Sequence, residues 1–323
     1  MTRPARLAFV MLAVGGSSAI AGARVAHACA ECGCGDPTLT VLGSEKPAAH
    51  RVRTGATLTL QGEEPGADEA VASLTEKRVD LAAAWAALDR VYLVASLPLV
   101  RRALTYTDGS RDEIDGVGDF ELRAKGFVWQ DRGFSPRHLV ALTLGARVPV
   151  APWHKDAAGA PVDPERQIGS GALSPIVGAS YAHFRFPWSG YFGVEASTPV
   201  VHEAWYRPAS SLRASVLGQA QLGHFLALQA GFDARWDGHG EESAAHSDGA
   251  IETDAFVHHH HLEDEEAGGL HAGGTAVFAS AGVVVTPFDD VLGFVQLRLP
   301  AFERLQEGQH NHAIVATGLI YDF

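Results

Sequence analysis

The chain ends in the stretch Ala313–Phe323, whose sequence is AIVATGLIYDF. Apolar or aromatic side chains recur there at alternate positions, namely Ala313, Val315, Leu319, Tyr321 and Phe323. Successive side chains of a β-strand point to opposite faces, so this spacing places all of them on one face. We therefore predict a strand that runs to the last residue of the chain.

The same alternation recurs in long stretches along the chain. The clearest examples span residues 78–87, 119–128, 212–221, 226–236 and 291–299. They are longer than the roughly five or six residues of an average strand and match the roughly 9–11 residues that cross a bilayer. Their polar faces carry both signs of charge, which is typical of a hydrated barrel interior. A soluble β-sandwich also alternates, but these lengths and charges favour an all-β, antiparallel transmembrane β-barrel.

The polar faces of these stretches predict which side chains face the lumen of the barrel. Mixed charges of this kind can plug a barrel or line a selective pore, and pairing with an opposite charge is the default for each residue. We expect a polar lumen, and no apolar path through it can be recognised in the sequence. The predicted lumen-facing residues are Arg53, Arg78, Asp80, Glu121, Arg123, Lys125, Arg213, Asp233, Arg235 and Arg298.

Short and long connections alternate along the chain. Short ones fall near Asp89–Arg90, Trp129–Pro136, Pro187–Gly190, Gly223–His224 and Pro287–Asp290. Long polar ones span Glu63–Leu74, Thr105–Gly116, Ala151–Ser170, Val201–Ala209, Asp237–Gly273 and Ala301–Gln309. Outer-membrane barrels have short periplasmic turns and long extracellular loops. The alternation therefore predicts about twelve strands within residues 50–323, with both termini on the periplasmic side.

The first 28 residues have the pattern of a cleaved signal peptide. Arg3 and Arg6 precede an apolar stretch that begins at Leu7, and Ala26-His27-Ala28 supplies small residues for cleavage. An uncleaved anchor is disfavoured because the apolar stretch is shorter than the roughly 20 residues of a spanning helix. A lipoprotein site at Cys29 is disfavoured by His27. Residues 29–49 are then expected to form a periplasmic N-terminal segment.

Export and an aromatic C-terminal strand together predict location in the outer membrane of a Gram-negative bacterium. The alternate positions of Tyr321 and Phe323 resemble the signal that the barrel-assembly machinery recognises. That machinery and outer-membrane lipid are therefore expected partners. The formal net charge of −13 argues against nucleic acid as a partner.

Short Gly-rich motifs give the chain a family resemblance. Residues 116–122 read GVGDFEL, residues 141–150 read ALTLGARVPV, and Ser170-Gly171 through Ala179-Ser180-Tyr181 follow in the same order. Over about residues 110–323 the chain resembles the outer-membrane transporter-like proteins of the MetA-pathway of phenol degradation group, which are related to fatty-acid and aromatic-compound channels. The resemblance implies a barrel of this size and passage of small, often apolar molecules, but no specific substrate. The Cys-containing N-terminus and a His-rich loop are departures from that group.

The segment Asp237–Gly273 is rich in histidine and acidic residues. It holds seven of the 16 histidines of the chain, and imidazole together with carboxylate suits zinc, nickel or copper(II). The alternative is a solvated acidic loop whose histidines are incidental. The candidate metal ligands in this segment are His239, His246, His258, His259, His260, His261 and His271.

The three cysteines, Cys29, Cys32 and Cys34, form a second candidate metal site. Closely spaced thiolates suit copper(I) or zinc, and the N-terminal amine or His50 would have to complete a tetrahedral set. The alternative is a local disulfide with one free thiol. No cofactor is expected to be required at either site.

These features predict an outer-membrane channel or transporter for a small solute, with a link to divalent metal ions through the His-rich loop. One alternative is a metal-binding surface protein whose barrel is plugged. Another is a lipid-modifying barrel enzyme, which would need a nucleophile and a base held together at the barrel exterior. The sequence has no Gly-x-Ser-x-Gly elbow, so we expect no enzymatic activity.

Overall fold

The computed structural model describes residues 52–64, 71–133, 136–155, 167–202, 206–223, 225–238, 240–242, 273–288, 290–305 and 309–323. All regular structure in these ranges is β, and none of their residues forms a helix long and apolar enough to span a membrane. The predicted signal peptide, the three cysteines and the histidines from His239 to His271 lie outside the described residues.

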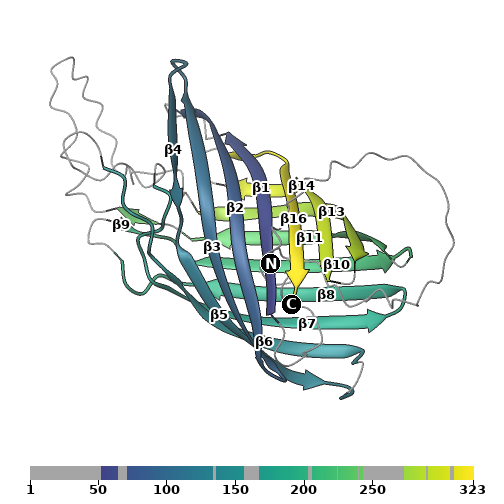
Figure 1. Cartoon of the computed structure of the whole chain (residues 1–323). Helices are drawn as coiled ribbons and strands as arrows, with labels where there is room; N and C mark the ends of the chain where they lie inside the picture. The colour runs from purple at the N-terminus through teal and green to yellow at the C-terminus, as the bar shows by residue number, and fades with distance from the viewer. Residues whose placement is uncertain are drawn as a thin grey trace, which may run out of the picture.

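The described strands form one closed antiparallel barrel of 12 strands, as the sequence predicts (Figure 1). The strands follow one another around the barrel in the order in which they occur in the chain. Strand β1 closes the barrel by pairing with both β2 and β16. The barrel strands are β1 (Val52–Glu64), β2 (Val71–Leu88), β3 (Val91–Tyr106), β5 (Phe120–Gln130), β6 (His138–Val148), β7 (Ser174–Arg185), β8 (Trp188–Ser197), β10 (Ser211–Gln221), β11 (Leu226–Asp237), β13 (Gly274–Phe288), β14 (Val291–Leu305) and β16 (Ile314–Asp322).

Four short strands add to this barrel at one end. Strand β4 (Arg111–Val117) pairs with β3, and β15 (His310–Asn311) pairs with β1. Strands β9 (Tyr206–Arg207) and β12 (Glu241–Glu242) pair only with each other. Strands β9 and β12 lie within segments expected to be long connections, β4 lies almost wholly within one, and β15 directly follows one, so these connections are partly structured.

The segment Thr105–Gly116, predicted as a loop, is instead a β-hairpin formed by β3 and β4. Its turn is tight because Gly109 adopts a φ of 83°, which glycine tolerates without steric cost, and Asp108 accepts hydrogen bonds from Ser110. The hairpin rises above the rest of the barrel (Figure 1). The prediction of a loop was wrong because charged residues at every second position, such as Arg111, Glu113 and Asp115, also fit a strand that is exposed to solvent.

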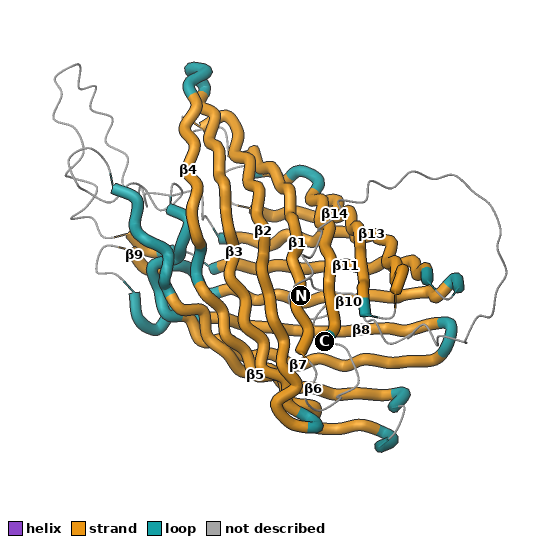
Figure 2. The backbone as a smooth tube through the Cα atoms, viewed as in Figure 1, coloured by secondary structure: helices purple, strands orange, loops and turns teal. Residues whose placement is uncertain are grey.

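The short connections all lie at one end of the barrel, called here the turn end, and the long ones at the opposite, loop end (Figure 2). The last residues also lie at the turn end. The N–H of Asp322 donates to the carbonyl of Asp290 over 2.9 Å, and that of Phe323 donates to the carbonyl of Val52 over 2.8 Å. The predicted alternation of connections, and the placement of both ends of the barrel beside the short turns, are confirmed.

The outer face of the barrel is apolar and exposed. Leu81, Leu144 and Phe232 are among the large apolar side chains that point outward, while their strand neighbours point inward. Aromatic side chains gather toward the turn end of this face, at Trp85, Trp129, Phe186, Trp188, Phe288, Tyr321 and Phe323. Trp236 and Phe302 lie toward the loop end. A contiguous apolar surface of this extent needs a nonpolar covering.

Candidate functional site

The interior of the barrel is divided into two halves of different character. The half near the turn end, called here the apolar half, is packed with buried side chains that point inward from the barrel strands β2 to β16, while β1 supplies none of those that the structure describes. Its members are Ala84, Ala86, Tyr92, Val94, Phe127, Leu139, Ala141, Ala182, Phe184, Tyr191, Leu217, Ala227, Val284, Leu292, Phe294, Ala316 and Ile320.

The apolar half contradicts the expectation of a polar lumen throughout. Near the short turns the strands are apolar on both faces, as in the segment Ala82–Leu88, so one set of apolar residues faces inward. Apolar side chains that the sequence interpretation did not place in the interior therefore pack against one another there. The sequence signal for these inward-facing apolar residues was the loss of polar–apolar alternation near the short turns.

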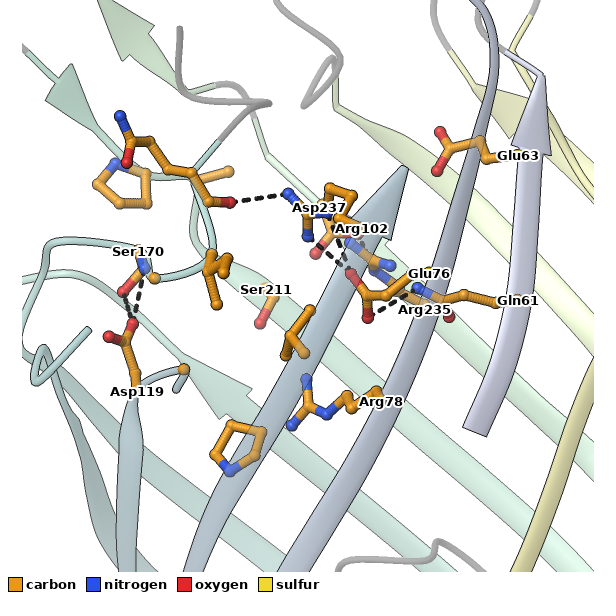
Figure 3. A pocket seen from close by; sticks show the side chains of 18 of the residues that line it. Gln61, Glu63, Glu76, Arg78, Arg102, Asp119, Ser170, Ser211, Arg235 and Asp237 are labelled. Carbon is orange, nitrogen blue, oxygen red and sulfur yellow. Dashed lines mark hydrogen bonds and ion pairs between the residues drawn. The ribbon is translucent and has the colours of Figure 1, made fainter. Parts of the chain in front are cut away.

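The loop half of the interior encloses a polar cavity of about 340 Å³ (Figure 3). Five arginines and five carboxylates line it. The arginines are Arg78, Arg102, Arg147, Arg213 and Arg235, and the acids are Glu63, Glu76, Asp119, Glu121 and Asp237. The formal charges of these ten side chains cancel, so the cavity is polar without a dominant sign.

One wall of the cavity is a buried network of ion pairs. The guanidinium of Arg123 donates to Glu121 and to Glu195 over 2.6 Å each, and Arg147 contacts the other oxygen of Glu121 over 2.7 Å. The side chains of Arg123, Glu121 and Glu195 are 5–8% exposed. At such burial each charge needs its partner, because an uncompensated charge in a low-dielectric site is costly.

A second network lies closer to the loop end. Glu76 accepts hydrogen bonds from Arg102 over 2.7 Å and from Gln61 over 3.3 Å, as the dashed lines in Figure 3 show. Arg78 pairs with Asp80 over 2.8 Å on the same strand. These contacts hold the guanidinium groups of Arg78 and Arg102 against the wall of the cavity.

The last residues of the connection between β6 and β7 form part of the cavity wall. Residues Gln167–Ser170 line the cavity, and the carbonyl of Gln167 accepts a hydrogen bond of 2.8 Å from Arg102. The side chain of Gln167 also exchanges hydrogen bonds with the backbone of His154. This segment, called here the inner loop, narrows the interior at the loop end.

Asp119 anchors the inner loop to the barrel. Its Oδ2 atom accepts hydrogen bonds of 2.6 Å from the backbone N–H and from the hydroxyl of Ser170 (Figure 3). Asp119 lies at the break between β4 and β5, where the N–H of Gly118 donates to the carbonyl of Pro98. A Cβ atom at Gly169 would lie 2.6 Å from Asp119 Oδ1, so glycine permits this close approach.

The opposite wall carries fewer charges and more amides. Gln229 donates to Gln219 over 3.2 Å, and Arg298 donates to Gln296 over 3.0 Å. Arg298 also lies 3.8 Å from Asp233. Arg235 pairs with Asp237 on the same strand.

The residues that the sequence assigned to the lumen are therefore spread over several places. Arg78, Glu121, Arg213 and Arg235 line the cavity. Arg53 pairs with Asp322 at the turn end, Arg123 is buried in the ion-pair network, and Lys125 lies 5.8 Å from the centre of the Phe127 ring. Asp80, Asp233 and Arg298 are paired within the wall.

Three cavity residues and one member of the ion-pair network were missed from the sequence. Glu76, Arg102 and Arg147 line the cavity and Glu195 pairs with Arg123; all four lie at alternating strand positions and could have been found by extending the pattern of each strand toward the loop end. Asp119 and the inner loop have no such signal, because their position depends on tertiary contacts between distant segments.

The two residues of the predicted assembly signal, Tyr321 and Phe323, lie on the outer face of the barrel with their ring centres 4.7 Å apart.

The predicted metal ligands are not placed by the structure. His239, His246, His258–His261, His271 and the three cysteines lie outside the described residues, so metal binding there stays a prediction. Among the residues that the structure does describe, no three His, Cys, Asp or Glu side chains gather in a group that could hold a metal ion.

Comparison with solved structures gives a clear likeness in fold. The COG4313 outer membrane channel from Pseudomonas putida F1 aligns with a TM-score of 0.64 at 13% identity, over 86% of this chain and 98% of that chain. The translocator domain of the autotransporter NalP from Neisseria meningitidis aligns at 11% identity with a TM-score of 0.45, over 85% of this chain and 90% of that chain. A deletion mutant of the TodX monoaromatic hydrocarbon channel gives 11% identity, the same coverage and a TM-score of 0.44.

Comparison of the sequence itself gives no family. No family model matches the chain, and the search of curated proteins gave no match. The resemblance to the MetA-pathway group therefore stays a prediction. At 13% identity, what this chain shares with the Pseudomonas putida channel is the barrel fold.

Proposed function

We propose that the protein is an outer-membrane channel for small, uncharged solutes that combine an apolar body with a polar group. The observation that carries this proposal is the succession of two environments inside one barrel. A polar cavity at the loop end adjoins an apolar half that reaches the turn end.

The outer face supports a location in the membrane. It is apolar along the strands, and aromatic side chains gather toward the turn end, as in the interfacial girdles of outer-membrane barrels. The strands are long enough to cross a bilayer, since the barrel strands span 9 to 18 residues. The fold shared with an outer membrane channel agrees with this placement.

The charges of the cavity favour an uncharged solute. Its five arginines and five carboxylates cancel, and many of them are already paired with one another. Hydroxyl or carbonyl groups of a solute can hydrogen-bond to such a wall without breaking a pair. A volume of 340 Å³ lies at the small end of the range of roughly 300–1,000 Å³ for small-molecule sites.

The apolar half favours an apolar body in the solute. A charged solute would lose its hydration there without an opposite charge to replace it, whereas burial of apolar surface contributes about 25 cal/mol per Å². Side chains such as Phe127, Tyr191 and Phe294 fill this half. Passage therefore requires these side chains to move aside one after another.

A flux assay tests the proposal. Phenol serves as the probe, and its uptake is measured into vesicles with a lipopolysaccharide outer leaflet, with and without the protein. Ala141 points into the apolar half, while its neighbour Leu142 points outward and is 49% exposed. We expect Ala141→Trp to reduce phenol uptake toward that of protein-free vesicles and Leu142→Trp to leave it unchanged.

The same assay can reject the proposal. Equal uptake by vesicles with and without the wild-type protein, or equal uptake by both tryptophan variants, would exclude passage through the apolar half. Gel migration before and after boiling shows whether each variant is folded. If Ala141→Trp fails to fold, Ala182→Phe blocks the same region from β7.

A metal-binding surface protein remains the second candidate, because seven of the 16 histidines gather in residues 237–273. Titration with zinc, nickel and copper(II), beside a variant lacking Glu241–His271, separates the two functions. Metal binding that depends on this segment, without phenol flux, would favour the second candidate.

A further inference from the structure

A pair of histidines lies on the outer face of the barrel at its turn end. His138 is the first residue of β6, and His183 lies near the end of β7. The two residues are direct cross-strand partners in the β6–β7 ladder. Their neighbours Leu139 and Ala182 are buried in the interior, so the two imidazoles point outward.

The ring nitrogens of this pair converge on one place. The Nδ1 atoms of His138 and His183 lie 3.3 Å apart, and the ring centres lie 4.5 Å apart. The hydroxyl of Tyr181 lies 2.6 Å from Nδ1 of His138. Three polar side-chain atoms therefore meet at the turn-end rim of the outer face.

Direct hydrogen bonds explain this arrangement only in part. An imidazole nitrogen carries either one proton or one lone pair, so Nδ1 of His138 makes one good hydrogen bond. The contact with Tyr181 satisfies it. Nδ1 of His183 then faces Nδ1 of His138, which already forms a hydrogen bond with the hydroxyl of Tyr181.

The separation of the two nitrogens suits a tetrahedral metal ion. Zinc binds imidazole nitrogen at about 2.0–2.1 Å, so two nitrogens of a tetrahedral site lie roughly 3.3–3.4 Å apart. The observed 3.3 Å agrees with this geometry. Square-planar ligands of the same bond length would lie closer, at roughly 2.9 Å.

The backbone that carries His138 is itself fixed. The carboxylate of Asp131 accepts hydrogen bonds from the N–H groups of Arg137, over 2.7 Å, and of His138, over 3.0 Å. These contacts order the turn that leads into β6. The backbone that carries the first imidazole is thus held in place.

We propose that His138 and His183 form a zinc site on the turn-end rim of the barrel. The ion is bound by the two Nδ1 atoms, and water completes its coordination. The hydroxyl of Tyr181 turns from His138 to a zinc-bound water. The site is separate from the interior cavity and from the histidines of residues 237–273.

Zinc bound at this place would link the β5–β6 hairpin to the β7–β8 hairpin. At the turn end, β6 is connected to β5 and β7 is connected to β8, so His138 and His183 belong to different hairpins. The two are joined there by the β6–β7 ladder, and the ion adds a side-chain bridge across it. Zinc should therefore raise the temperature at which the barrel unfolds.

Histidine labelling of the full chain tests the proposal. The folded protein in detergent is titrated with zinc and treated with diethyl pyrocarbonate, and mass spectrometry of its peptides reports each histidine separately. We expect zinc to protect His138 and His183 together. His183→Gln should abolish the protection of His138, and Tyr181→Phe should raise the zinc concentration for half-protection about tenfold.

A matched control uses another histidine with a polar neighbour. His310 lies at the loop end, 3.6 Å from Glu303, and its side chain is 69% exposed. His310→Gln should leave the protection of His138 unchanged. If His183→Gln does not fold, His138→Gln gives the reciprocal test through the labelling of His183.

Three results would overturn the site. Protection restricted to histidines in residues 239–271 would place the metal elsewhere. If zinc does not protect His138, the two histidines form a hydrogen-bonded pair that binds no zinc. Protection of His138 that persists in His183→Gln would show that the two imidazoles do not act as one chelate.

Discussion

The guanidinium of Arg53 in β1 donates two parallel hydrogen bonds to the carboxylate of Asp322 in β16, across the seam where the first and last strands close the barrel. The two residues are direct cross-strand partners. Their side chains are 10% and 22% exposed. The closure of the barrel is therefore reinforced by a bidentate ion pair beside the C-terminus.

Replacing Arg53 by Ala should destabilise the folded barrel by on the order of 3 kcal/mol, because the partly buried carboxylate of Asp322 loses its partner. Urea unfolding in detergent, followed by gel migration, measures the change. Arg111→Ala is the control, since Arg111 pairs with Glu113 on the exposed hairpin and should cost less than about 1 kcal/mol. Equal losses for the two variants would contradict this account of closure.

The ion-pair network of the cavity wall makes a different prediction. Arg123→Ala removes the cation that contacts Glu195 and one oxygen of Glu121, and should cost about 3–5 kcal/mol. The double variant Arg123→Met, Glu195→Gln removes one cation and one carboxylate together, keeps the pair of Glu121 with Arg147, and should regain most of that stability. A double variant no more stable than Arg123→Ala would show that charge burial is not the cause.

The contact between Asp119 and Ser170 should hold the inner loop in the interior. Asp119→Ala removes two hydrogen bonds to a carboxylate, each contributing about 1.5–3 kcal/mol. We expect phenol uptake into lipopolysaccharide-containing vesicles to become faster. Asp89→Ala, in the turn between β2 and β3, is the control and should take up phenol like the wild type. Wild-type uptake by Asp119→Ala would mean that the inner loop does not limit passage.

The barrel itself was predictable from the sequence. The alternation at Leu226–Trp236 is clear because one face meets nonpolar surroundings and the other meets the interior. The short turns could be located because tight connections need residues such as Asp89 and Gly223. These are local properties of the chain, which the sequence displays directly.

The interior was predictable only in part. Glu121 and Arg213 could be assigned to the lumen by alternation, but the alternation does not reveal that Arg123 bridges two acids from different strands. The apolar half was missed because alanine-rich strand ends, such as Ala82–Leu88, are apolar on both faces. The inner loop depends on contacts such as Asp119–Ser170, which join residues far apart in the chain.

The C-terminal aromatic residue should act in assembly and contribute little to the stability of the finished barrel. Phe323 and Phe288 both lie on the outer face at the turn end, and their side chains are 70% and 71% exposed. We expect Phe323→Ala to lower the amount of folded barrel in cells, whereas Phe288→Ala should not. Both variants should fold equally in detergent. Equal amounts of folded Phe323→Ala and Phe288→Ala in cells would contradict a role of Phe323 in assembly.

The most direct test of the central claim is the rate of phenol uptake into lipopolysaccharide-containing vesicles by the double variant Phe127→Ala, Phe294→Ala. Both side chains lie in the apolar half, and their truncation should widen the path without touching the polar cavity. If solutes pass through the apolar half, the double variant should take up phenol several-fold faster than the wild type. Uptake at the wild-type rate by a correctly folded double variant would contradict the proposed path.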